Sequence, residues 1–259
     1  MKEIEKIIQN SGNNFHCRVS NFFNSKNWTT LISPYYTDIV TDKPREIDII
    51  AENEYPLLNH FGRKAGTVNI SLNIECKYLS KETVFWFDKK DTYKANEWIL
   101  KNTPHQEIIR SRDKHRYLNT NEKVAKLFAS SNKPSSENEM FYKALNQCLN
   151  AMVYNRRSDS IIQRNQSTKV LKTIEYPVII CNSFEKLYRV EIDDDSKISK
   201  IQDNFQIEVN YAYLDFNQKR RREYFLIDVI DFNKTDEFLD VLQKDAESII
   251  NIIRLNKDF

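Results

Sequence analysis

Two acidic side chains and one amine stand at unusual places in this 259-residue sequence. Asp48 lies within an isoleucine-rich run at residues 45–51, and Glu75 and Lys77 end a run of alternating apolar and polar residues at 68–78. A buried carboxylate without a partner is costly, so an aspartate inside an apolar run needs one. If the two runs are neighbouring strands, Asp48 and Glu75 can point to a common spot. Lys77 then projects from the same strand face as Glu75, because strand side chains repeat every two residues.

Two carboxylates at one spot are the kind of ligand that hard divalent cations prefer. Mg²⁺ and Mn²⁺ take oxygen ligands, keep several waters, and often bind one or two carboxylates together with phosphate oxygens of a substrate. The spacing Asp/Glu-x-Lys also occurs at residues 88–90 and 195–197. Neither of those copies ends an apolar strand, so the copy at Glu75 is the one that predicts a metal site.

The elements that must position these residues follow from hydrophobic periodicity. Apolar residues at helical spacing predict helices, and apolar runs or strict alternation predict strands. In the first part of the chain the predicted elements are a helix at 13–25, strands at 28–33, 45–51 and 68–78, a helix at 137–155, and a strand at 176–181. Between 80 and 136 the composition turns polar, and we expect an insertion with helical pieces.

This order of elements, with Asp48 in the second strand and Glu75, Cys76 and Lys77 ending the third, resembles the PD-(D/E)xK nuclease superfamily. The resemblance covers roughly residues 12–182. It implies a restriction-endonuclease-like fold, an α/β architecture with a mixed central sheet flanked by helices. Here an insertion follows the Glu-x-Lys strand and a strand and helix extension occupies residues 183–259. With no Ser/Gly-rich linker in the sequence, we expect residues 1–259 to form a single elaborated domain.

The resemblance also implies roles for individual residues. Asp48 and Glu75 would be the metal-binding carboxylates, the backbone carbonyl of Cys76 a further metal ligand, and Lys77 the group that orients or polarises the attacking water. The implied activity is Mg²⁺-dependent (or Mn²⁺-dependent) hydrolysis of phosphodiester bonds in DNA, by an endonuclease of restriction or genome defence. A structure-selective nuclease of DNA repair or recombination is one alternative. A degenerate nuclease-like module that binds nucleic acid or protein without cutting is another.

In related nucleases the first helix often contributes a glutamate, and this sequence has none at the corresponding place near Phe15 and His16. Three accessory candidates remain open. His16 either takes the place of that glutamate or has a surface or packing role. Glu46, two residues before Asp48, is either a second acidic ligand or a solvated charge at the strand end. Gln147, on the helix at 137–155, either lies beside the metal or is ordinary helix-surface polarity.

Two basic clusters are candidates for contact with phosphates. Lys219, Arg220, Arg221 and Arg222 are consecutive between two predicted strands, and a second cluster lies at residues 110–116. Local positive charge matters more for nucleic-acid binding than the overall balance. The alternatives are a solvated hairpin tip for the first cluster and a solvated helix face for the second. We assign no role to His105 or His115, because their spacing suggests no ligand set.

The last third of the chain predicts strands at 187–192, 205–214 and 224–230 and an amphipathic helix at 235–255. This part either extends the sheet, with the helix buried against it, or builds a homodimer interface. A homodimer would bring two active sites to the two strands of a duplex, and a partner subunit of a defence system is a further expectation.

Composition excludes several other classes. The chain has 39 Lys+Arg against 37 Asp+Glu and only 3 Gly, so it is neither a polyelectrolyte nor a carrier of a Gly-rich nucleotide-binding loop. The four cysteines have no C-x-x-C spacing, which predicts reduced thiols and no zinc site. No apolar run approaches the ~20 residues of a membrane span, and no secretory signal is apparent. We therefore expect a cytoplasmic protein without a membrane partner.

Overall fold

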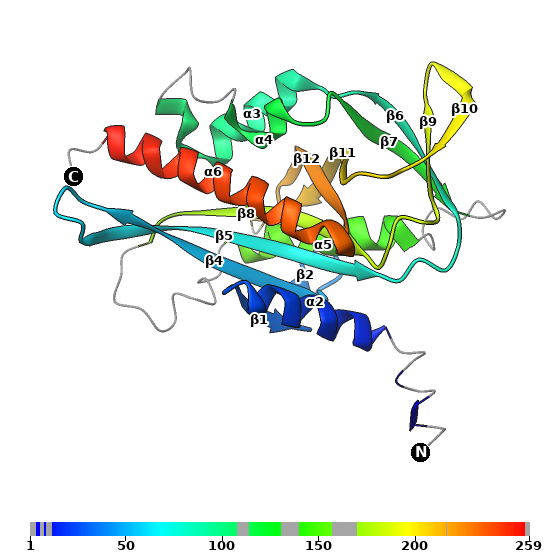
Figure 1. Ribbon diagram of the computed structural model, residues 1–259, viewed down its shortest axis with the longest axis horizontal. Helices are drawn as coiled ribbons and strands as arrows, with labels where there is room; N and C mark the ends of the chain where they lie inside the picture. Colours follow the sequence, from blue (N-terminus) through cyan, green and yellow to red (C-terminus); the bar gives the residue numbers. More distant parts are fainter. Residues whose placement is uncertain are drawn as a thin grey trace.

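The computed structural model describes residues 12–107, 114–130, 140–156, 170–215 and 217–256, together with residues 4, 5 and 8. In this part of the chain a ten-stranded mixed sheet is flanked by helices on both faces (Figure 1). The order of its strands is β1-β4-β5-β8-β12-β11-β7-β6-β9-β10, and a separate ribbon contains β2 and β3. The architecture is therefore α/β with a large mixed sheet, as expected.

The bounds of the elements follow the chain. The helices are α2 (Asn13–Ser25), α3 (Thr92–Asn102), α4 (Arg116–Asn119), α5 (Met140–Asn155) and α6 (Thr235–Asn256), with short 3₁₀ turns η1 (Pro104–Glu107) and η5 (Phe232–Lys234). The strands are β1 (Thr29–Ile32), β2 (Tyr35–Asp38), β3 (Lys43–Glu46), β4 (Ile49–Leu58), β5 (Lys64–Lys77), β6 (Thr83–Lys89), β7 (Lys123–Ser130), β8 (Val170–Cys181), β9 (Leu187–Glu191), β10 (Asp194–Lys200), β11 (Phe205–Leu214) and β12 (Arg220–Asp231).

Strand β5 organises the centre of the sheet. It pairs antiparallel with β4 and parallel with β8, and β8 pairs parallel with β12. The carboxyl ends of β5, β8 and β12 therefore meet at one edge of the sheet. Along β5 the even-numbered residues Ile70, Leu72 and Ile74 pack in the cluster that contains α2 and α6, whereas the odd-numbered positions face the α5 side.

The amphipathic helices form where periodicity predicts them. Helix α2 has the predicted bounds, α5 begins at Met140, and residues 137–139 of the predicted helix lie outside the described part. Helix α6 buries Leu242, Ala246 and Ile249 against the sheet. Burial against its own sheet, one of the two interpretations of this helix, is confirmed. None of the described helices combines the length and apolar character needed to cross a membrane.

One predicted strand is wrong in a way that matters for the site. Residues 45–51 do not form one strand, because β3 ends at Glu46, β4 begins at Ile49, and the chain bends at Ile47 and Asp48. Two backbone hydrogen bonds hold this bend: the amide of Ile47 donates to Pro34 O (3.1 Å), and the amide of Ser33 donates to Asp48 O (2.8 Å). Asp48 thus stands at the entrance to β4, where the chain passes from the ribbon into the main sheet.

One other part of the chain also differs from the expectation. The polar segment at 80–136 contributes β6 and β7 to the main sheet, so it is more than an insertion of helical pieces. Its aromatic run pairs with β7 on one side and with β9 on the other, which explains why Phe85 and Phe87 are buried. In the last third of the chain β12 lies between β8 and β11. These C-terminal strands extend the sheet, which belongs to the same interpretation as the burial of α6 against it.

Candidate metal centre

The candidate site forms where the ladder between β4 and β5 ends. The last pair of this ladder is Ile49 with Ile74. Beyond it, the backbone amide of Cys76 donates to Asp48 Oδ2 at 2.7 Å, so a side chain takes the place of the next ladder bond. The N–H and C=O groups of one strand residue point toward the same neighbour. The carbonyl of Cys76 therefore faces the side on which Asp48 lies.

Asp48 and Glu75 approach each other around Lys77. The ammonium Nζ of Lys77 lies 2.7 Å from Glu75 Oε2 and 4.0 Å from Asp48 Oδ2. Glu75 is fully buried, and the side chains of Asp48 and Lys77 are 15% and 16% exposed. The predicted combination of two carboxylates and one amine is present at this spot, with the amine between the two acids.

The electrostatics of Glu75 show a carboxyl group that lacks enough partners. Burial raises the pKa of Glu75 to about 7, the nearby Lys77 opposes this rise, and the charge of Asp48 adds to it. Its Oε1 atom is buried and has no hydrogen-bond partner among the residues that the structure describes. A buried acceptor in that state is destabilising unless something else satisfies it. The Oε1 atom of Glu75 therefore has a lone pair left for a cation.

Lys77 keeps its charge in this buried setting. Burial alone would lower its pKa, but the charges of Glu75 and Asp48 outweigh burial and raise the pKa above its usual value. The ammonium is consequently the protonated, positively charged member of the group near neutral pH. It offsets part of the repulsion between the two carboxylates.

His16 reaches the same place from helix α2. Phe15 and Val19 of this helix are buried in the core, which holds the helix against the sheet and sets His16 beside the site. His16 Nε2 lies 3.4 Å from Asp48 Oδ2. Together with the sulfur of Cys76, these two atoms form a group of donors that all lie within 4.8 Å of one another.

The sulfur of Cys76 is the least suitable donor of that group. Burial raises the pKa of the thiol well above its ordinary value, with the charges of Asp48 and Glu75 adding to the effect. A metal-binding cysteine acts as a thiolate, and hard cations prefer oxygen. The chemistry of the remaining donors is one imidazole nitrogen, the carboxylates of Asp48 and Glu75, and the Cys76 carbonyl.

The other accessory candidates lie in a different arrangement. Glu46 belongs to β3, in the two-stranded ribbon, and the period-of-two argument that linked it to Asp48 fails because the chain bends between them. The side-chain amide of Gln147 donates to the backbone carbonyl of Glu46 at 3.3 Å. Gln147 thus connects α5 to the ribbon that leads into Asp48.

Tyr36 is a residue of this region that sequence reasoning missed. It lies on β2 and is 4% exposed. Burial raises its pKa above the usual value, and the charge of Glu75 is the next largest cause. The phenol therefore lies within electrostatic reach of the site. A strand of four residues is too short to show a clear alternation, and the sequence YYTD does not distinguish buried Tyr36 from exposed Tyr35.

The two basic clusters differ in their exposure to solvent. Lys219, Arg220, Arg221 and Arg222 are exposed at the hairpin between β11 and β12, where Arg221 pairs with Asp215 at 2.8 Å. Lys219, Arg220 and Arg222 are exposed for contact with a partner, whereas Arg221 is already paired within the protein.

The described residues of the second cluster are mostly buried. Arg110 and Arg112 lie outside the described residues, and Lys114 is exposed, but His115 and Arg116 are buried. Arg116 donates to both oxygens of Asp228, at 2.6 and 2.7 Å. Its guanidinium is committed to the interior, so the expectation of a phosphate contact there is wrong.

A scan of protein-family models and searches of curated proteins and of solved structures gave no match to this chain. The function therefore has to be argued from the geometry and chemistry of the residues themselves.

Proposed function

We propose that the chain is a divalent-metal-dependent phosphodiesterase with a restriction-endonuclease-like core, an endonuclease that hydrolyses DNA. The observation that carries the proposal is the buried, unpartnered Oε1 of Glu75 at the sheet edge where Asp48 and Lys77 also lie. Most buried structural carboxylates have their lone pairs satisfied by the protein. An acid that keeps one unsatisfied beside a second acid is typical of a group that binds a cation.

The donor set fits a small divalent cation. Asp48, Glu75 and the Cys76 carbonyl supply oxygens, and His16 supplies a nitrogen 3.4 Å from the Asp48 oxygen. Neighbouring ligands of an ion bound at about 2.1 Å lie about 3 Å apart, so this separation suits two ligands of one ion. When bound, Mg²⁺ or Mn²⁺ would stabilise charge on the phosphate oxygens and lower the pKa of a bound water.

The protein's own groups would then divide the work. Asp48 and Glu75 hold negative charge in place for the cation, and burial of Glu75 limits the water that competes for it. The Lys77 ammonium donates hydrogen bonds and carries a positive charge 2.7 Å from Glu75. It is suited to hold the attacking water and to stabilise the negative charge that develops on the phosphate.

Restriction or genome defence is the setting we propose, and repair or recombination of branched DNA is the alternative. Comparing cleavage of a plain duplex with cleavage of a branched one separates them. A homodimer or a defence partner subunit would fit either setting. If the chain binds Mn²⁺ and DNA and cuts neither substrate, it is instead a binding module of the same fold.

The test is a cleavage assay on plasmid DNA with Mg²⁺ or Mn²⁺. Asp48→Asn and Lys77→Met should each reduce the rate by at least about 100-fold, in the range of losses from removing one charge-stabilising group. The matched control is Asp88→Asn, from the other Asp-x-Lys tripeptide, whose aspartate is exposed on β6. Melting temperatures within a few degrees of wild type would show that the variants fold. Unchanged rates in both site variants would reject the proposal.

A further inference from the structure

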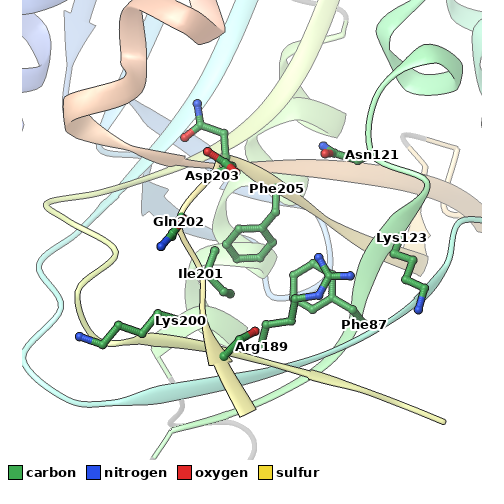
Figure 2. A pocket seen from close by; sticks show the side chains of 11 residues that line it. Phe87, Asn121, Lys123, Arg189, Lys200, Ile201, Gln202, Asp203 and Phe205 are labelled. Atoms are coloured by element: carbon green, nitrogen blue, oxygen red, sulfur yellow. The ribbon is translucent and has the colours of Figure 1, made fainter. Parts of the chain in front are cut away.

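A second polar site lies at the same edge of the sheet as the metal centre. A cavity of about 440 Å³ opens between β9, the segment after β10, and the start of β7 and β11. Figure 2 shows its lining: Arg189 lies over Phe87, with Lys200 on one side and Lys123 on the other. Three cations of different elements thus line one hollow.

Two of these cations are held in fixed positions by one acid. Arg189 Nε donates to Glu191 at 2.7 Å, and Lys123 Nζ donates to the other oxygen of Glu191 at 2.6 Å. The guanidinium of Arg189 also lies 4.2 Å from the centre of the Phe87 ring, which restricts its plane. Two positive charges share one negative charge, so this trio keeps a net charge of +1.

Lys200 adds a further positive charge. Its side chain is exposed, and within the described residues its ammonium takes part in no ion pair. The acid of the lining, Asp203, is paired with Lys234 at 2.6 Å and therefore does not neutralise it. Lys123, Arg189 and Lys200 together with Glu191 sum to a charge of +2, and the charge of Asp193, which also acts on Lys123, lowers this toward +1.

Strand register places this hollow relative to the metal centre. Glu75 pairs with Ile179, Ile179 with Val229, and Val229 with Phe205, which lines the cavity. Paired residues of neighbouring strands share a face of the sheet, and neighbouring strands lie about 4.8 Å apart. Three such steps put Phe205 about 15 Å from Glu75, on the same face.

We propose that the cavity bounded by Lys123, Arg189 and Lys200, whose strands lie beyond that of Phe205, binds the phosphodiester backbone of DNA more than about four nucleotides from the bond that the metal centre cleaves. The proposal rests on the proposed function. One strand of B-DNA carries a phosphate for every 3.4 Å of helix axis, so about 15 Å corresponds to about four steps. A row of cations on one side of the site would anchor the duplex without reading its sequence.

The test compares two charge reversals on the same strand, β10, at Lys200 and at Lys197. Lys200→Glu removes the free amine of the cavity. Lys197→Glu makes the same change in net charge at an exposed residue that pairs with Asp194 and does not line the cavity. Binding of a fluorescein-labelled 24-base-pair duplex is measured by anisotropy without divalent metal, at several salt concentrations, and cleavage of plasmid DNA is assayed in parallel.

We expect Lys200→Glu to weaken binding of the 24-base-pair duplex at least about 10-fold and to lower the salt slope by about one. Lys197→Glu should stay within about twofold of wild type. Equal losses in the two variants would overturn the cavity proposal, and active plasmid cleavage in that case would leave the nuclease proposal intact.

Each of the remaining outcomes also supports or rejects one of the two proposals. Selective loss in Lys200→Glu without cleavage by the wild type would support the cavity as a DNA site and reject the nuclease activity. Absence of duplex binding by the wild-type protein, with no cleavage, would reject both. A competitive arm with inorganic phosphate separates a backbone site from a small-anion site. Displacement of the 24-base-pair duplex at low millimolar phosphate and constant ionic strength would contradict binding to the backbone.

Discussion

Asp48 makes three contacts through a single oxygen at the end of β5. Its Oδ2 accepts the Cys76 amide and lies near both His16 and Lys77. The hydrogen bond from the Cys76 amide holds the Asp48 carboxylate in position. The side chain is therefore positioned before any ligand arrives, which is what a metal ligand requires.

The imidazole of His16 should make the site sensitive to the kind of metal. Imidazole nitrogen suits Co²⁺ and Ni²⁺ better than Mg²⁺, which prefers oxygen. His16→Gln is expected to weaken Co²⁺ binding by about 10-fold or more and Mg²⁺ binding by less than about threefold, by calorimetry. His60→Gln, an exposed residue in the turn before β5, is the control. Equal losses for both metals would show that His16 is not a ligand.

Glu175 on β8 should make the stability of the protein fall as pH rises. Part of its side chain reaches solvent, but its Oε2 atom is buried and finds no partner in the described part of the chain. Burial raises its pKa to about 7, with Arg156 opposing the shift. Between pH 4.5 and 7 the folded state binds the proton more tightly than the unfolded state, so the free energy of unfolding decreases with increasing pH.

Glu175→Gln removes this dependence. Relative to wild type, the variant should gain between about 1 and 3 kcal/mol of stability from pH 5 to pH 8, as expected for a shift of this size. Urea unfolding at the two pH values measures the difference. Glu122→Gln, at an exposed position, should show no such gain. A pH-independent difference between wild type and Glu175→Gln would contradict the assignment.

At the scale of elements, a buried ion-pair network joins α4 to the sheet and to α6. Arg116 of α4 donates to Asp228 of β12, and its Nε lies 3.2 Å from Asp245 of α6. Gln206 of β11 donates to the same Asp228 at 3.0 Å. Burial raises the pKa of Asp245 to about 6, although Arg116 opposes this shift. The network connects α4 to three elements, β11, β12 and α6, that follow it much later in the sequence.

Removing the arginine should therefore be costly. Arg116→Met leaves buried acids without their cation and should destabilise the protein by about 3–5 kcal/mol in chemical unfolding. Adding Asp228→Asn should recover about 1 kcal/mol or more, because it removes one uncompensated charge. The control is Lys64→Met, which breaks the partly exposed pair with Glu54 and should cost less than about 1 kcal/mol. A small loss in Arg116→Met would contradict this account.

Local pattern explains which elements could be predicted. Helices α2, α5 and α6 repeat their apolar residues at helical spacing, and β5 alternates along most of its length, so short-range periodicity was sufficient. The bend at Ile47 and Asp48 depends on hydrogen bonds to Ser33 and Pro34, which no local pattern reveals. The strands β6 and β7 pair with each other inside the segment, but the strands that join them to the main sheet, β9 and β11, lie outside it.

The residues of the site likewise fall into those that local sequence could predict and those that it could not. Asp48, Glu75 and Lys77 could be selected because a charge that ends or interrupts an apolar strand is a local signal. The approach of His16 comes from helix packing, and the burial of Arg116 comes from Asp228 and Asp245, more than 100 residues away. Such residues look like surface charges in the sequence, because their partners are chosen by the fold.

At the scale of the whole molecule, the C-terminal third is part of the central sheet. The register of β12 against β8 joins residues 228–231 to 178–181, so the segment after residue 182 completes the core around the candidate site. A chain truncated after residue 182 should fail to fold cooperatively, because β8 becomes an open edge with buried residues such as Ile179 exposed. Size-exclusion chromatography and thermal unfolding of residues 1–182 test this expectation. A monomer with a sharp unfolding transition would contradict it.

The two outer strands of the sheet limit how copies of the chain can associate. At one rim β1 is only four residues long, and at the other rim β10 has the sequence DDSKISK, rich in charge. Short or charged rims resist the addition of a foreign strand. If two copies act together on the two strands of a duplex, we therefore expect them to meet through helices or loops, leaving the sheet uninterrupted and finite.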